Sequence, residues 1–168
     1  HDISQKKGDP IMSITCYTRP IQYYETDRMG VVHHSNYIRW MEEARVDFMN
    51  QCGLPYAKLE QRGIMMPVLS ASCQYKVALH FGESFSVKTI VKQYNGFKLI
   101  LSYEIYHADT GTLCATGETM HCLIYTLPFS KQVSVPFQIQ ANMPKEKTAD
   151  PIYIGRCDFL FSFYDSSK

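Results

Sequence analysis

The segment Tyr24–Tyr37 reads YETDRMGVVHHSNY and holds the residues whose types and order could support a reaction. Asp27 precedes Gly30 by three residues, and both precede the start of a predicted helix. Glycine permits a tight turn, and the free N–H groups at a helix start carry partial positive charge that can stabilise an oxyanion. A carboxylate opposite such donors could attack a polarised carbonyl or activate a water molecule. The same residues also suit a plain turn that compensates the helix dipole, so the local pattern leaves both interpretations open.

The wider segment TDRMGVVHHSNYIRWMEEAR resembles the signature of the 4-hydroxybenzoyl-CoA thioesterase family, especially its bacterial acyl-CoA thioesterase branch. In that signature an Asp is followed, after two residues, by Gly-Val-Val, Tyr-His, two further residues, Tyr and then Glu-x-Ala-Arg. The positions that match are Asp27, Gly30, Val31, Val32, His34, Asn36, Tyr37, Glu42, Ala44 and Arg45. The family usually has tyrosine at the position of His33, and we expect this difference to alter the pocket wall rather than the chemistry. The resemblance is specific over Ile21–Tyr56 and architectural over Met65–Tyr125.

The resemblance implies an acyl-CoA thioesterase, an enzyme that hydrolyses a thioester to a free acid and CoA. Asp27 matches the family's catalytic carboxylate, which acts as nucleophile or general base. A backbone N–H at or near His34 matches the donor that polarises the thioester carbonyl, while the His34 side chain assists or shapes the pocket. The predicted substrate-binding residues around this pair are Gly30, Val31, His33 and Tyr37.

The phosphates of CoA favour basic side chains near the mouth of the pocket. The candidates on strand ends or faces are Lys76, Lys92 and Lys98, although lysines on exposed strands are usually solvated. The resemblance implies no separate cofactor, since CoA is part of the substrate, and no metal. Neighbouring histidines in a strand or helix are expected to point in different directions, and no carboxylate-plus-histidine set lies nearby in the sequence. The spacing of His33 and His34 therefore gives little support to a metal site.

Two other functions fit parts of the sequence. The first is a hydratase or dehydratase of acyl thioesters on the same fold, in which His34 would work with Glu42 or Glu43, although either acid lies more than two helical turns away. The second is a non-catalytic module that binds acyl-CoA or another protein, and the aromatic run DFLFSFY near the C-terminus is its best support. A serine hydrolase is unsupported because the sequence has no G-x-S-x-G motif.

A long helix must hold the reactive segment in place. Apolar residues recur at three- and four-residue steps, as on one face of a helix, at Tyr37, Met41, Ala44, Phe48 and Cys52. Ser35 or Asn36 is predicted to cap its start, because a side-chain oxygen there accepts a free backbone N–H. Gly53 followed by Pro55 ends it, and a second short helix is predicted over Tyr56–Gln61.

The rest of the patterned sequence alternates as β-strands do. A first strand is expected within Ser13–Tyr24, where Pro20 places it near an edge. Four longer strands are predicted after the helix, over residues 69–79, 84–92, 98–105 and 112–125. Asn95-Gly96 between two of them is a strong hairpin signal. One helix can cover only one face of such a sheet. The predicted fold is therefore α+β, a hotdog fold in which an antiparallel five-stranded sheet wraps around one long helix.

Composition limits the classes of protein that fit. The chain has 168 residues, enough for one domain, and 45% of them are apolar, enough for a buried core. A net charge of +1 gives no long-range attraction to nucleic acid, and no apolar run approaches the roughly 20 residues of a membrane span. The six cysteines are scattered and form no C-x-x-C pair. With no recognisable signal peptide, the sequence favours reduced cysteines and a cytoplasmic protein.

Three regions are predicted along the chain. Residues 1–11 are polar and aperiodic, and we expect them to be a disordered leader or tag. Residues 12–128 form the predicted hotdog thioesterase domain, and residues 129–168 form a proline-containing C-terminal tail of unknown role. Members of the resembled family pair their sheets across a dimer and often form tetramers. The resemblance therefore implies a homodimer or homotetramer with active sites at the subunit interface.

Overall fold

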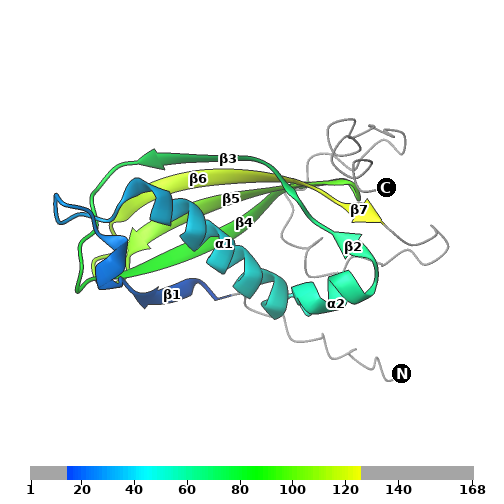
Figure 1. Cartoon of the computed structure of the whole chain (residues 1–168), viewed down its shortest axis with the longest axis horizontal. Helices are drawn as coiled ribbons and strands as arrows, with labels where there is room; N and C mark the ends of the chain where they lie inside the picture. The colour runs from blue at the N-terminus through cyan, green and yellow to red at the C-terminus, as the bar shows by residue number, and fades with distance from the viewer. Residues whose placement is uncertain (1–14, 126–168) are drawn as a thin grey trace, which may run out of the picture.

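The computed structural model describes residues 15–125 (Figure 1). Its elements are, in order, β1 (Tyr17–Pro20), the 3-10 turn η1 (Tyr23–Glu25), α1 (His34–Gln51), α2 (Tyr56–Gln61), β2 (Ile64–Met65), β3 (Val68–Tyr75), β4 (Ser84–Tyr94), β5 (Lys98–His107), β6 (Leu113–Cys122) and β7 (Ile124–Tyr125). The predicted leader over residues 1–11 and the predicted tail over residues 129–168 lie outside the described residues.

Five strands form one antiparallel sheet in the order β1-β4-β5-β6-β3. Helix α1 lies across one face of this sheet (Figure 1), so the predicted five strands and single long helix are confirmed. The β4–β5 hairpin turns at Asn95-Gly96 as predicted, because Gly96 adopts the positive φ of 90° that such turns favour. Strand β2 was not predicted, and β7 lies within the last predicted strand, over residues 112–125. The two pair with each other as a separate two-stranded ribbon.

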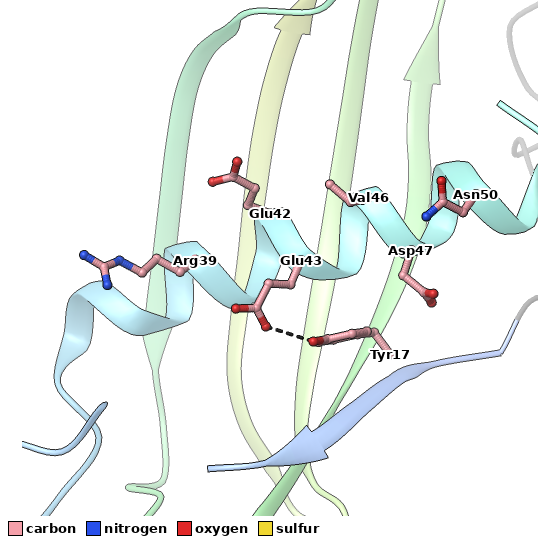
Figure 2. A pocket seen from close by; sticks show the side chains of 7 residues that line it. All are labelled: Tyr17, Arg39, Glu42, Glu43, Val46, Asp47 and Asn50. Atoms are coloured by element: carbon pink, nitrogen blue, oxygen red, sulfur yellow. Dashed lines mark hydrogen bonds between the residues drawn. The ribbon is translucent and has the colours of Figure 1, made fainter. Parts of the chain in front are cut away.

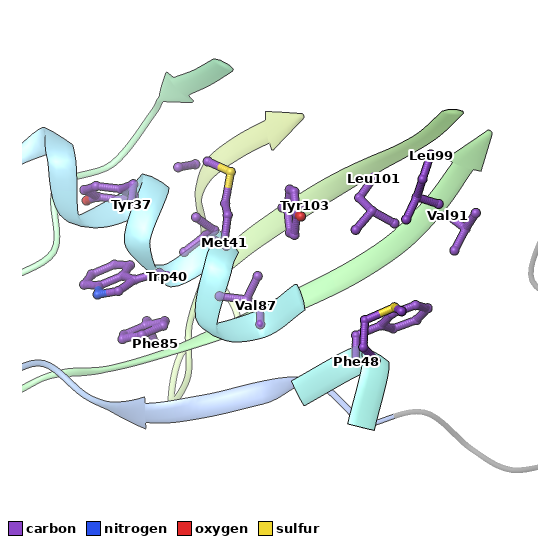
Figure 3. Packing of buried hydrophobic residues seen from close by; sticks show 14 of the residues in the cluster. Tyr37, Trp40, Met41, Phe48, Phe85, Val87, Val91, Leu99, Leu101 and Tyr103 are labelled. Carbon is purple, nitrogen blue, oxygen red and sulfur yellow. The ribbon is translucent and has the colours of Figure 1, made fainter. Parts of the chain in front are cut away.

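Helix α1 and the sheet bury a shared apolar core (Figure 3). Trp40 of α1 stacks on Phe85 of β4, with ring centroids 3.8 Å apart and planes 10° from parallel. Met41 packs over β6 at Gly117, where an added Cβ atom would overlap the end of the Met41 side chain and lie 2.9 Å from the Ser72 carbonyl oxygen. The missing side chain therefore lets the helix approach the sheet closely, and a larger residue at Gly117 would push it away.

The start of α1 differs from the prediction. His33 is the capping residue, and its Nδ1 atom accepts the N–H of Ser35 at 3.3 Å. The prediction that Ser35 or Asn36 caps the helix is wrong, because both residues lie inside its first turn. The C-terminal end of α1 agrees with the prediction, since Gly53 follows it with a φ of 73°. The second helix, α2, spans the predicted Tyr56–Gln61.

Three strands are shorter than predicted, and one of them is β6, which covers Leu113–Cys122 of the predicted residues 112–125. Strand β1 covers only Tyr17–Pro20, since the chain then turns into η1. Strand β3 ends at Tyr75, because the N–H groups of Lys76 and Val77 both donate to the Cys114 carbonyl and break the regular ladder. β3 is also an edge strand, so most of its side chains are exposed. Within residues 15–125, no helix is long and apolar enough to cross a membrane.

Candidate active site

Asp27 lies in a tight hairpin loop that joins η1 to α1. Thr26 and Val32 form a β-bridge at its base. The N–H of Asp27 donates to the Val31 carbonyl at 2.8 Å, and the N–H of Gly30 donates to the Asp27 carbonyl at 3.0 Å. Gly30 takes a φ of 78°, a left-handed conformation that favours glycine. These bonds fix the Asp27 backbone from both sides.

The Asp27 carboxylate is half-buried and only partly engaged. Its Oδ1 atom accepts the N–H of Met29 at 2.8 Å, as in an Asx turn. Its Oδ2 atom has no hydrogen-bond or ion-pair partner among the described residues. The adjacent Met29 side chain is 79% exposed, so the loop opens to solvent on that side in a single protomer. One carboxylate oxygen is thus oriented by the loop while the other is free to act on a ligand.

The start of α1 leaves one backbone donor unused beside this loop. The N–H of His33 donates to the Glu25 carbonyl, that of Ser35 to His33 Nδ1, and that of Asn36 to the His33 carbonyl. For the N–H of His34, residues 15–125 provide no acceptor. Unpaired N–H groups at a helix start attract negative charge, which is the property that oxyanion stabilisation needs.

The predicted substrate-binding residues surround this donor in different ways. The rings of His33 and His34 lie 4.1 Å apart, and the His34 side chain is exposed. The His34 carbonyl accepts the hydroxyl of Tyr75 at 3.0 Å, which ties the end of β3 to the start of α1. Tyr37 is 3% exposed and packs between Trp40 and Tyr75. Burial raises the pKa of Tyr37 to about 12, so its hydroxyl stays protonated and it supports the site from within the core.

The segment between β3 and β4 holds the far side of the loop. Val31 forms a β-bridge with His80, and the N–H of Val32 donates to the Leu79 carbonyl at 2.8 Å. Val31 and Val32 are therefore bound to a second part of the chain. Asp27, Gly30 and Val31 share one loop that runs directly into His33 and His34 at the start of α1, and their roles in binding and catalysis stay predictions.

The three predicted CoA-binding lysines do not converge within one protomer. Lys76 directly follows β3, at the end where Tyr75 contacts the start of α1. Lys92 and Lys98 lie at the opposite end of the sheet, on either side of the β4–β5 turn. Lys92 is also paired with Glu118 of β6. Only Lys76 is at the Asp27 end of the fold.

A depression of about 540 Å³ lies on the outward face of α1, away from the Asp27 loop (Figure 2). Its lining residues are Tyr17, Arg39, Glu42, Glu43, Val46, Asp47 and Asn50. The acidic side chains there point away from the core, whereas Asn36 and Arg45, two other polar residues of α1, are buried. Because Glu42 and Glu43 line this outer depression, neither acid faces the apolar interior of the fold.

Sequence reasoning missed a buried carboxylate two residues before Asp27. Glu25 is 2% exposed and is bonded to Arg19 from β1 and to Trp40 from α1. No spacing rule connects these three residues, which meet only when β1, η1 and α1 are folded together. Residues 15–125 contain no group of three or more His, Cys, Asp or Glu side chains placed to hold a metal ion.

Comparison with known proteins identifies the family of the chain. Residues 21–143 match the thioesterase-like superfamily. An Aquifex aeolicus protein named provisionally as an esterase is 37% identical over 73% of this chain and 92% of its own length. A Bacillus subtilis protein named provisionally as an acyl-CoA thioesterase is 35% identical over 77% of this chain and 89% of its own length.

A solved structure extends the match from sequence to fold. The structure of a DHNA-CoA thioesterase from Staphylococcus aureus aligns with a TM-score of 0.63 and 36% identity, covering 68% of this chain and 76% of that chain. The predicted resemblance to hotdog thioesterases, which was drawn from the Asp27–Arg45 signature, is confirmed by these matches. The chain belongs to the thioesterase-like superfamily, a family of thioester hydrolases, and shares its hotdog fold.

Proposed function

We propose that this protein hydrolyses acyl-CoA thioesters with Asp27 as the catalytic carboxylate and the N–H of His34 as the oxyanion donor. The observation that carries the proposal is that one short loop and the helix start it leads into hold both a carboxylate oxygen without a partner, on Asp27, and a helix N–H without an acceptor, on His34, within residues 15–125. The related proteins from Bacillus subtilis and Staphylococcus aureus, whose names refer to CoA thioesters, support the substrate class.

The geometry supports two routes that share the same donor. In both, the thioester carbonyl oxygen accepts the N–H of His34, which stabilises the negative charge formed on attack. As general base, Asp27 takes a proton from water while the hydroxide adds to the carbonyl carbon. As nucleophile, Asp27 adds directly and forms a mixed anhydride that water then opens. In either route the C–S bond breaks, the thiolate of CoA leaves and takes up a proton, and a free acid is released.

The remaining residues of the proposed site shape the pocket around this pair. Gly30 and Val31 form the floor of the loop, and the adjacent His33 and His34 rings form one wall. Lys76 is the candidate of first choice for the CoA phosphates because it lies at the same end of the fold. For Lys92 and Lys98, CoA binding stays a prediction that requires a second subunit to bring them close.

We also propose that the working enzyme is a homodimer or a homotetramer, with each site completed by a neighbouring subunit. Within one protomer the Asp27 loop is open beside Met29. The end of the edge strand β3 lies at the same site through the bond from Tyr75 to the His34 carbonyl. A second copy paired along β3 would close this opening and remove the exposed strand edge.

The direct test is a panel of acyl-CoA thioesters, scored by release of free thiol, with wild-type protein and Asp27→Asn. Asparagine keeps the size of the side chain but can neither attack nor accept a proton. We expect a loss in kcat of about 100-fold or more, in line with the effect of removing a positioned base or nucleophile. Asp109→Asn is the matched control, because Asp109 is an exposed acid in the β5–β6 turn.

Three outcomes would overturn parts of this proposal. Turnover by Asp27→Asn within about threefold of wild type would remove Asp27 from the chemistry, since a catalytic base contributes far more. Water addition to enoyl thioesters in place of hydrolysis would favour the hydratase alternative. Tight acyl-CoA binding with no turnover over long incubation would favour the non-catalytic binding module.

A further inference from the structure

Glu25 is the most heavily bonded carboxylate near the candidate site. Its Oε1 atom accepts Arg19 Nη2 at 2.7 Å and Trp40 Nε1 at 2.8 Å. Its Oε2 atom accepts Arg19 Nη1 at 2.9 Å and the N–H of Gln22 at 2.8 Å. Burial alone would raise the pKa of Glu25, but these donors outweigh it and hold that pKa below its usual range. The side chain is therefore an ionised, fully satisfied carboxylate inside the protein.

The backbone of Glu25 is bonded to the start of α1. Its carbonyl oxygen accepts the N–H of His33 at 2.8 Å and the side-chain Nδ2 of Asn36 at 2.7 Å. His33 is the cap that precedes the unpaired N–H of His34. One residue thus joins the strand β1, the loop that carries Asp27 and the first turn of α1. We call Glu25, with its side-chain donors Arg19 and Trp40, the Glu25 clamp.

The clamp rests on the rigid part of the fold. Trp40 stacks on Phe85 in the core, and the Arg19 guanidinium lies 5.9 Å from the Trp40 ring and 5.0 Å from the Phe85 ring. The Asp27 loop itself has little packing of its own, since Arg28 and Met29 are exposed. The attachment at Glu25 therefore anchors the side of the loop that leads in from β1 and meets the start of α1, while the bonds of Val31 and Val32 to the β3–β4 segment anchor the other side.

We propose that Glu25 is a positioning residue for the reaction, one that holds the Asp27 carboxylate at a fixed place relative to the N–H of His34. This inference rests on the proposed function, in which those two groups act on one thioester. Catalysis is sensitive to such placement, because misplacing reacting groups by about 1 Å can cost about 100-fold in rate. Glu25 itself is buried and does not touch the substrate.

Glu43 provides a matched control within the same ion-pair network. Its carboxylate accepts Arg19 Nε at 2.8 Å and Arg19 Nη2 at 3.1 Å, and it also accepts the Tyr17 hydroxyl. It lies on the outward face of α1 (Figure 2) and is bonded to neither the Asp27 loop nor His33. Glu25→Gln and Glu43→Gln therefore each remove one negative charge that is paired with Arg19. Only Glu25→Gln is expected to loosen the Asp27 loop.

The kinetic test compares these two variants with wild type on one acyl-CoA that the panel identifies as a substrate. Glutamine at position 25 places an NH₂ group against donors and leaves them poorly paired. We expect Glu25→Gln to lower kcat by about 10- to 100-fold with KM changed less than about threefold, because geometry rather than binding is lost. Glu43→Gln should keep both constants within about threefold of wild type.

A gentler variant and a second readout keep the test decisive. Trp40→Phe removes the bond from Nε1 to Glu25 and part of the indole volume, but it leaves an aromatic ring against Phe85 and the Glu25 charge in place. It is the second variant if Glu25→Gln fails to fold, and we expect it to lower kcat several-fold at constant KM. Amide hydrogen exchange by NMR, without substrate, should be faster at the N–H groups of Asp27 and His33 in Glu25→Gln and unchanged in Glu43→Gln.

The possible failures are separable. Equal kcat losses in Glu25→Gln and Glu43→Gln, or a raised KM with kcat intact, would overturn the positioning role. Unchanged exchange at Asp27 and His33 in Glu25→Gln would show that the clamp does not hold the loop. A wild-type protein that turns over no acyl-CoA would instead refute the proposed function, while the exchange result would still report on the clamp.

Discussion

At the scale of single residues, two acids in the same short loop have opposite surroundings. Glu25 is buried and bonded through both carboxylate oxygens, whereas Asp27 is half-buried with one oxygen free. Asp27 could be named as a candidate from the sequence because its spacing to Gly30 and His34 follows a recognisable signature. Glu25 could not, because its burial arises only where Arg19 and Trp40 arrive from separate elements. A local pattern predicts local geometry, and it contains no information about contacts between distant segments.

His121 is a second buried polar residue that the pattern of β6 did not distinguish from an ordinary strand residue. It is fully buried, and its Nε2 atom lies 2.8 Å from Thr119 Oγ1. Burial, followed by the positive charge of Arg45, lowers the pKa of His121 from 6.5 to about 4. The unfolded chain therefore takes up the proton first as pH falls, so stability is full above pH 6.5 and declines from there toward pH 4.

The lowered pKa of His121 predicts that the free energy of unfolding depends on pH between pH 7 and pH 5, where carboxylates contribute little to such a dependence. Between pH 7 and pH 5, wild type should lose about 2 kcal/mol of unfolding free energy through His121. The measurement is urea unfolding at both pH values for wild type, His121→Gln and the exposed-site control His80→Gln. His121→Gln should lose most of the pH dependence and His80→Gln should keep it. A pH dependence that survives intact in His121→Gln would contradict the assignment.

At the scale of elements, periodicity was the most reliable guide. The apolar stripe predicted α1, and turn residues predicted α2 and the β4–β5 hairpin. The two-residue strand β2 was missed because so short a segment shows no alternation, and β7 was predicted only as the end of the strand that contains β6. The helix cap was predicted at the wrong residue because Ser and Asn are the usual capping types. A histidine nitrogen at the preceding position has the same ability to accept an N–H.

The cap at His33 gives a prediction about α1. Replacing His33 by alanine removes the Nδ1 acceptor of the Ser35 N–H, so we expect a loss of about 1 kcal/mol in the free energy of unfolding. His33→Asn should retain most of the stability, because asparagine is a strong capping residue. Chemical denaturation at neutral pH measures both variants. Equal losses in the two would show that the imidazole contributes through its packing on His34 and not as a cap.

At the scale of the whole molecule, one helix covers one face of the sheet, and charged and hydroxyl side chains line much of the other face. The outer face carries ion pairs between neighbouring strands, Lys88 with Glu104 and Lys92 with Glu118. This arrangement was foreseeable, because the outward positions of β4 and β5 alternate as charged and hydroxyl residues. The position of β3 at the sheet edge was not foreseeable, since strand order is not encoded in alternation. Apolar residues exposed along and just after β3 are Val68, Leu69, Tyr75 and Val77.

These exposed residues define the last prediction, that a second copy of the chain pairs along β3. A free strand edge with apolar side chains favours association, and a stable interface buries about 1,000 Å² or more. The variant Leu69→Lys/Val77→Lys places two charges in this surface and should shift the protein to monomers in light scattering after size exclusion. If the neighbouring subunit completes the site, the rate of acyl-CoA turnover should fall as the dimer fraction falls, and more steeply at low protein concentration.

Val46→Lys is the control, since Val46 is exposed on the outward face of α1. A monomeric wild type, or dissociation by Val46→Lys but not by the double variant, would place any interface elsewhere and leave Asp27 in a site formed by one chain.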